Sequence, residues 1–100
     1  MPIFVLFKVE IKEGKEEEYR RTVAEVLNDI KGQKGLISME RAKSILKERT
    51  YVSISEWEDE EAIEKWVNHP KHQEAMRKGK DELFSWYSVK RMAELKKERG

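Results

Sequence analysis

The chain has 100 residues, no cysteine and 41% charged residues, with a formal net charge of +1 at pH 7. This length suits one domain, and the absence of cysteine excludes disulfide bonds and thiol catalysis. Because the charges nearly cancel, the composition does not favour a nucleic-acid partner. No apolar run reaches the roughly 18 residues that a membrane span needs. The composition fits a reducing compartment, so we expect a cytoplasmic protein.

The first half of the chain predicts a strand, a helix and a hairpin. Residues 3–11 (IFVLFKVEI) alternate at the two-residue period of a strand and are apolar on both faces in their first half. Acidic residues followed by apolar residues at helical spacing predict a helix from Glu16 to Lys31. Residues 35–43 and 50–58 predict two strands, and the short charged connection between them favours an antiparallel hairpin.

The next segment predicts two short helices that meet at a proline. Asp59 is suited to cap the first helix. Pro70 disfavours helical geometry at His69 and suits the first turn of a second helix. We expect that second helix to run to about Arg77 and to end at Gly79.

Residues 84–92 predict a fourth strand, and the complete order is β-α-β-β-α-β. This order is typical of the ferredoxin-like α+β fold, a four-stranded antiparallel sheet with helices on one face. Residues 1–93 are therefore expected to form the domain, and residues 94–100 a polar C-terminal tail. The helices leave the other face of the sheet uncovered, where Phe4 and Leu6 lie. We expect two sheets to pack face to face in a homodimer, which would cover them.

Several short motifs lie at the junctions of these elements. They are GKEEE at residues 14–18, GLI at 35–37, WEDEEA at 57–62, Trp66, NHP at 68–70 and His72. In order and spacing they resemble the antibiotic biosynthesis monooxygenase family, and the likeness extends to about Met92. The resemblance implies a dimeric α+β barrel. It also implies one of three roles: a cofactor-independent oxygenase of aromatic polyketide or quinol-type substrates, a haem-degrading enzyme, or a small protein of another role.

The haem-degrading branch of that family uses an Asn, a Trp and a His at fixed positions. Carried over to this chain, the Trp falls at Trp66, the Asn at or near Phe7 and the His at Met76. Because two of the three residues differ, the resemblance favours a protein without a cofactor. Methionine can ligate haem iron, so a haem-binding or haem-degrading monooxygenase is retained as an alternative. A non-catalytic, ligand-binding stress-response dimer is a second alternative.

The stretch from Trp66 to Met76 holds both histidines of the chain. His72 and Met76 share a helix face, and a neutral imidazole there could remove a phenolic proton from a substrate. A surface position for His72, with no role in chemistry, is the competing interpretation. A metal site usually needs three or four convergent ligands, and beside His69 and His72 only Glu74 lies near in sequence. No metal site is therefore expected, and the stretch is also interpreted as a helix junction.

The resulting prediction is a cofactor-independent monooxygenase that acts on a small aromatic or quinol-like substrate. The predicted catalytic residues are His72 and Trp66. The predicted substrate-binding residues are Phe7, Trp66, His69, His72 and Met76.

Overall fold

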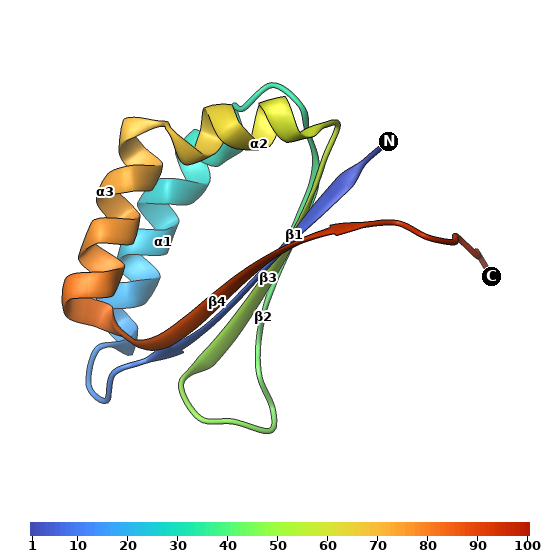
Figure 1. Cartoon of the computed structure of the whole chain (residues 1–100). Helices are drawn as coiled ribbons and strands as arrows, with labels where there is room; N and C mark the ends of the chain where they lie inside the picture. The colour runs from blue at the N-terminus through green and yellow to red at the C-terminus, as the bar shows by residue number, and fades with distance from the viewer.

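The computed structural model describes all 100 residues, with three helices on one face of a four-stranded antiparallel sheet (Figure 1). The strands are β1 (Ile3–Ile11), β2 (Leu36–Lys43), β3 (Thr50–Trp57) and β4 (Phe84–Ala93), in the order β2-β3-β1-β4. The helices are α1 (Glu16–Ile30), α2 (Glu60–Val67) and α3 (Pro70–Lys78), and a π-helical turn, η1 (Gly79–Leu83), follows α3. The predicted ferredoxin-like α+β fold is confirmed. None of the helices has the length and apolar character needed to cross a membrane.

The inner face of the sheet supplies most of the buried side chains. Side chains alternate along a strand, and on β1 the inward Val9 and Ile11 are fully buried. On β3, Tyr51 lies opposite Val9, and both Tyr51 and Trp57 are buried on the same face. The alternation predicted for these two strands is therefore confirmed.

The core is divided into two clusters at the two ends of α1. One cluster joins Tyr19, in the first turns of α1, to Leu83 and the end of β1. The other joins Ile30, the last residue of α1, to Trp57 and α2. Fifteen helical residues separate the ends of α1 by roughly 22 Å, at 1.5 Å per residue. The fold is thus packed at both ends of this helix, and the space along its middle is bounded by side chains of both layers.

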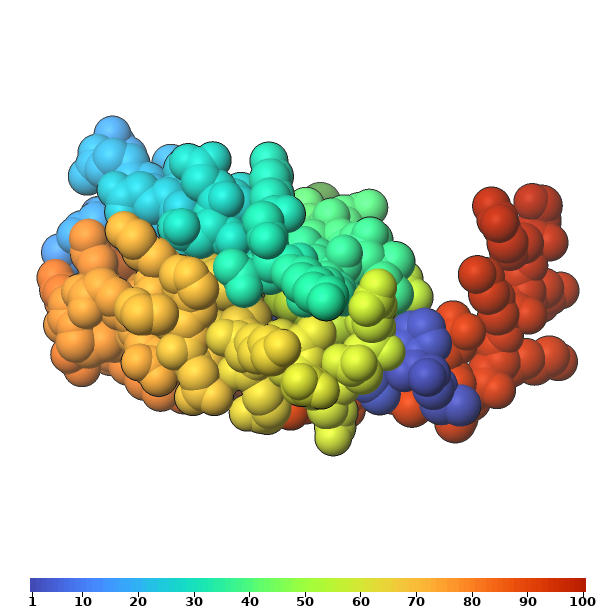
Figure 2. Space-filling model, turned by 90° about the horizontal axis from the view of Figure 1, so that it is seen from above, coloured from blue at the N-terminus to red at the C-terminus, as the bar shows by residue number.

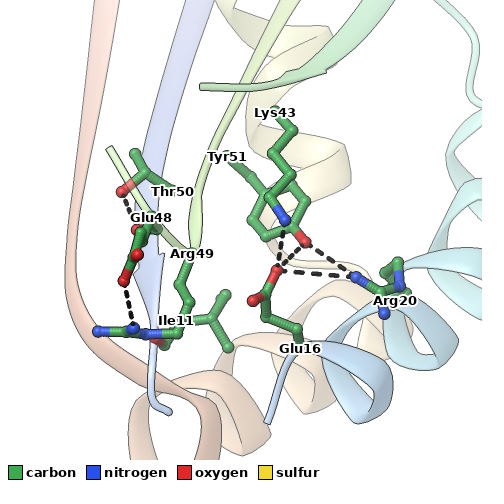
Figure 3. Close-up of polar contacts among 8 residues, drawn as sticks. All are labelled: Ile11, Glu16, Arg20, Lys43, Glu48, Arg49, Thr50 and Tyr51. Carbon is green, nitrogen blue, oxygen red and sulfur yellow. Dashed lines mark hydrogen bonds and ion pairs between the residues drawn. The ribbon is translucent and has the colours of Figure 1, made fainter. Parts of the chain in front are cut away.

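The first turn of α1 is held against the hairpin by a polar cluster (Figure 3). Glu16 accepts a hydrogen bond of 2.5 Å from the hydroxyl of Tyr51 and lies 3.0 Å from the ammonium of Lys43. Arg20 donates to the same tyrosine hydroxyl at 3.1 Å. The hydrogen bond from Tyr51, and next the one from Lys43, hold the pKa of Glu16 below its usual value. These contacts fix α1 to β2 and β3 at one end of the sheet.

The glycine that opens β2 is required by its surroundings. Gly35 has φ +93°, and a Cβ atom placed there would lie 2.5 Å from the Cβ of Ala62 on α2. Any larger residue would therefore be strained in its backbone and would push α2 away from the sheet. This contact links two of the motifs seen in the sequence.

The junction between α2 and α3 lies at Pro70, as predicted. His69 has extended backbone geometry, Pro70 is the first residue of α3, and the helix continues to Lys78. Gly79 follows in right-handed backbone geometry, so a glycine is not needed there for a left-handed conformation at the end of the helix. A Cβ atom at Gly79 would lie 2.3 Å from the ring of Phe84, and this close approach lets η1 turn the chain into β4.

The outer face of the sheet has no helix over it (Figure 1). Phe4 pairs with Met92, and Leu6 pairs with Ile54, so these side chains form one continuous surface. Ile54, Trp86 and Met92 are 40%, 50% and 37% exposed. Trp86 is therefore outside the core of the single chain. We call Phe4, Leu6, Ile54, Trp86 and Met92 the outer patch.

The last residues of the chain lie apart from the domain. Residues 94–100 form neither helix nor strand and are exposed. Figure 2 shows them, in red, standing clear of the other atoms, while α1 lies beside α2 and α3 over the sheet. The tail therefore makes no contribution to the packing that surrounds the site described next.

Candidate functional site

A cavity of about 750 Å³ lies between the helices and the inner face of the sheet. Ligand-binding clefts are commonly about 300–1,000 Å³ and mostly apolar, and here 18 of the 28 lining residues are hydrophobic. The middle of α1 contributes Val23, Val26 and Leu27 to the lining. The cavity thus occupies the space between the two core clusters.

Four of the five predicted substrate-binding residues line this cavity. They are Phe7, Trp66, His72 and Met76. Phe7 enters from the central strand, whereas the other three come from the helical segment around Pro70. His69 is not among the lining residues. The sequence pattern therefore brings together side chains from two layers at one concave site.

His72 is held with one ring nitrogen engaged and the other free. Its Nδ1 lies 3.2 Å from the carbonyl oxygen of Val67. Because a carbonyl only accepts hydrogen bonds, Nδ1 carries the hydrogen and Nε2 keeps its lone pair. Nε2 makes no hydrogen bond, and no buried side-chain nitrogen or oxygen in the chain lacks a partner, so Nε2 is accessible. This is the tautomer that a general base requires.

The surroundings of His72 favour its neutral form. Burial is the largest effect and lowers the pKa of the imidazole below its usual value, and the positive charge of Lys80 lowers it further. The hydrogen bond to Val67 acts in the opposite direction and does not reverse the shift. The ring of His72 also contacts the ring of Trp66 edge-on, with centroids 5.3 Å apart. At pH 7 His72 is therefore an uncharged base beside an indole wall.

His69 has a different position. Its Nδ1 accepts a hydrogen bond of 3.0 Å from the backbone N–H of Lys71, which caps the start of α3. Its ring lies 5.3 Å from the ring of Trp66. The two histidines therefore contact the same indole. His69 caps the start of α3, whereas His72 lines the cavity.

Trp66 and Trp57 form neighbouring parts of the wall. Trp57 is 1% exposed, and its indole N–H donates to Ser55 at 2.8 Å. Trp66 is 5% exposed, but its indole N–H has no protein acceptor. Since no buried polar atom lacks a partner, the N–H of Trp66 is accessible and can donate to a bound molecule. Ser55, on β3, is thus engaged by the indole of Trp57.

Sequence reasoning misses a second polar group in the cavity. Arg41, on β2, donates to the hydroxyl of Tyr19, on α1, at 2.6 Å, and both residues line the cavity. The two-residue period of β2 places Arg41 on the inner face with Met39, so a signal for its direction is present in the sequence. Nothing in the sequence indicates that Tyr19 lies next to it, since the two residues come together only when α1 packs on β2.

The structure shows where the side chains that could ligate a metal ion or a haem iron lie. No three His, Asp or Glu side chains lie close enough together to hold a metal ion. Met76 and His72, the two side chains that could ligate a haem iron, both line the cavity. Phe7 and Met76 line the cavity at the positions where the haem-degrading pattern has Asn and His, so the site differs from that pattern at two of its three residues.

Comparison with known proteins gives a consistent family and fold. A family model described as antibiotic biosynthesis monooxygenase matches residues 2–78. Protein SO0527 from Shewanella oneidensis superposes with a TM-score of 0.85 at 21% identity, covering 91% of this chain and 88% of that one. Rv0793 from Mycobacterium tuberculosis gives a TM-score of 0.88 at 14% identity, with 97% and 98% of the two chains covered.

A solved structure with a described activity shares the fold as well. SnoaB from Streptomyces nogalater, described as a cofactor-independent oxygenase, superposes with a TM-score of 0.82 at 14% identity, covering 96% of this chain and 95% of that one. At such identities the likeness concerns the fold. No protein of curated function matches this chain significantly.

Proposed function

This chain belongs to the antibiotic biosynthesis monooxygenase family, since the family match covers residues 2–78, and from that premise we propose that it is a monooxygenase of small aromatic substrates. The proposed reaction uses molecular oxygen and no metal or flavin. The observation that carries the proposal is the neutral His72, with a free Nε2, at the wall of an apolar cavity beside Trp66.

The proposed reaction begins with removal of a proton. Nε2 of His72 takes the proton of a phenolic hydroxyl, and the anion that remains can give an electron to oxygen far more readily than the neutral phenol can. Oxygen then bonds to a ring carbon that bears hydrogen, and the protonated His72 returns its proton to the peroxide that forms. Loss of water from this hydroperoxide leaves a carbonyl. One oxygen atom enters the product, the other leaves as water, and all the electrons come from the substrate. The work of the protein is proton removal and retention of the anion in a dry cavity.

Lys80 is placed to assist this step. It follows α3, lines the cavity mouth and lies over the ring of Tyr87 at 5.8 Å. Its charge already acts on His72, where it lowers the pKa. The same positive charge would attract a phenolate formed beside His72.

The proposed function is tested by oxygen uptake with a panel of hydroxynaphthalenes, hydroxyanthracenes and quinols at pH 7. We expect protein-dependent uptake of one oxygen molecule per product, and a product mass that contains one atom from ¹⁸O₂. Samples with a chelator, and samples with added haemin, serve as controls for metal and haem chemistry. Activity only with haemin would favour the haem-degrading alternative, and binding of these ligands without any oxygen uptake would favour the non-catalytic dimer.

We further propose that the outer patch is the interface of a homodimer. Family resemblance implies a dimer of this kind, and the patch consists of apolar side chains on a face that no helix covers. Leu6 lies at the centre of this face, between Ile54 on β3 and Lys90 on β4. A second copy, related by a two-fold axis, would place the same apolar side chains against one another.

Light scattering is expected to give twice the chain mass of 11.9 kDa at micromolar concentration. Leu6→Glu would bury a charge at the interface and is expected to shift the protein toward monomer. Glu25→Lys, on the exposed side of α1, is the control and should leave the mass unchanged. A monodisperse wild-type monomer would show that the outer patch is not a stable interface.

A further inference from the structure

Four positively charged side chains line the cavity, and they differ in how their charge is balanced. They are Arg41, Arg77, Lys80 and Arg91. Arg77 is paired with Glu74 at 2.6 Å and with Asp81 at 3.3 Å, and Arg91 is paired with Glu64 at 2.7 Å. Arg41 and Lys80 have no carboxylate partner within ion-pair distance. Of these two, Lys80 is exposed and lies at the mouth, whereas Arg41 is partly buried.

Arg41 is engaged through only one of its donors. Its Nη2 donates to the hydroxyl of Tyr19, and its guanidinium carbon lies 5.6 Å from the centre of the Tyr19 ring. A guanidinium has five N–H donors, so the others are available to a ligand. Tyr19 is buried, and burial raises the pKa of its phenol. It therefore keeps its proton at neutral pH, and that proton has no acceptor in the chain.

We propose that Arg41 and Tyr19 form an anion subsite at the β2 edge of the cavity, and that the ligand is an aromatic acid whose carboxylate binds there. This inference rests on the proposed function, because it assigns the substrate class of the same cavity. A carboxylate would accept a charge-assisted pair of hydrogen bonds from the guanidinium and a further one from Tyr19. It would also supply the negative charge that Arg41 lacks among its protein neighbours.

The arrangement of the helices sets the shape of this ligand. Arg41 and Tyr19 connect β2 to α1, whereas the ion pair of Arg91 with Glu64 connects β4 to α2. β2 and β4 are the two edge strands, with β3 and β1 between them, so they are roughly 14 Å apart at the usual strand spacing. His72 lies near Lys80, whose charge acts on it and whose ammonium lies over the ring of Tyr87 on β4, so His72 is on the β4 side of the cavity. The ligand would thus be elongated, with fused rings along the cavity, its carboxylate at Arg41 and its acidic hydroxyl at His72.

The anion subsite is tested with two matched probes, 2-naphthoate and 2-naphthamide, whose rings are identical and whose charges differ. Their dissociation constants are measured by calorimetry at pH 7 on the wild-type chain. We expect the acid to bind about 10-fold to 100-fold more tightly than the amide, as a charged hydrogen bond is worth more than a neutral one. Arg41→Gln is expected to abolish this preference and to leave the affinity for the amide within about threefold.

Two further arginine variants separate the subsite from general charge effects. Arg21→Gln removes the same charge from the exposed surface of α1 and should keep the preference for the acid. If the preference survives in Arg41→Gln and disappears in Arg91→Gln, the proposal is wrong and the carboxylate binds at the β4 edge. Circular dichroism on each variant establishes that the fold is retained.

The comparison on the wild-type chain also separates this inference from the proposed function. Equal affinity for the two probes would overturn the anion subsite and leave the cavity as a site for aromatic molecules. Binding of neither probe would overturn the subsite together with the cavity site on which it rests. Oxygen uptake with uncharged phenols only, at rates that Arg41→Gln does not change, would retain the oxygenase and remove the subsite.

Discussion

Replacement of His72 by alanine is expected to lower the turnover number of the proposed oxygenase by about two to four powers of ten, the usual contribution of a positioned general base. The imidazole is held by Val67 with Nε2 free, and no other side chain in the cavity combines a neutral nitrogen base with burial. Oxygen uptake under saturating substrate measures the change. Stability should change little, because His72 is only partly buried.

The pH dependence of the wild-type chain provides an independent readout of the same residue. Burial lowers the pKa of His72, so the base stays uncharged to below the ordinary value of about 6.5. We expect kcat/KM to be level near pH 7 and to fall as the pH drops through that lowered pKa. The His72→Ala variant should lack this acidic limb and keep only a low, level rate. If the His72→Ala variant kept full activity, His72 would have a role in the helix junction alone.

Folding stability should respond to His72 in the same direction. The unfolded imidazole binds a proton at a higher pH than the folded one does, so the unfolded state gains protons first as the pH falls. The free energy of unfolding is therefore expected to be highest above about pH 6.5 and to decrease as the pH drops through the lowered pKa of the folded state. Resonances of the His72 ring, followed by NMR, report that pKa directly.

Replacement of Trp66 by alanine is expected to reduce the free energy of unfolding by about 3–5 kcal/mol, the usual cost of removing a buried indole. Trp66 is 5% exposed and belongs to the core cluster with Trp57 and Ile63. Its ring also contacts the rings of His69 and His72. Denaturant unfolding measures the loss, and oxygen uptake by the folded fraction should fall as well, because the wall that orients His72 is gone.

Trp66→Phe is the matched control for this variant. Phenylalanine fills most of the space and should recover more than half of the lost stability, while it removes the indole N–H that is free to donate to a ligand. A Trp66→Ala variant as stable as the wild type would show that the wall closes over the missing ring. Activity that survives in Trp66→Ala but not in Trp66→Phe would contradict a role for Trp66 in positioning His72.

Local rules were sufficient for the elements around the site. Alternation in β1 and β3 follows from the two-residue period, and the break before α3 follows from the ring of Pro70, which sterically restricts His69. The resemblance to a known family added the prediction that Trp66 lies at the functional site. These features are local in sequence, and so a single chain is enough to predict them.

The remainder of the site depends on contacts between distant segments. Arg41 and Tyr19 are 22 positions apart and meet only because α1 packs over β2. The hydrogen bond between His72 and Val67 depends on the angle between α2 and α3, which no periodicity specifies. The cavity is equally non-local, because it is the volume that the two core clusters leave between them.

The division of the core into two clusters has a consequence for how such a protein evolves. The fully buried core lies at the two ends of α1, whereas Val23, Val26 and Leu27 along its middle are only partly buried and line the cavity. Substitutions there would reshape the cavity while the chain stays above the threshold for folding. Selection could therefore exchange one substrate for another by small steps, and relatives with the same backbone need not share a reaction.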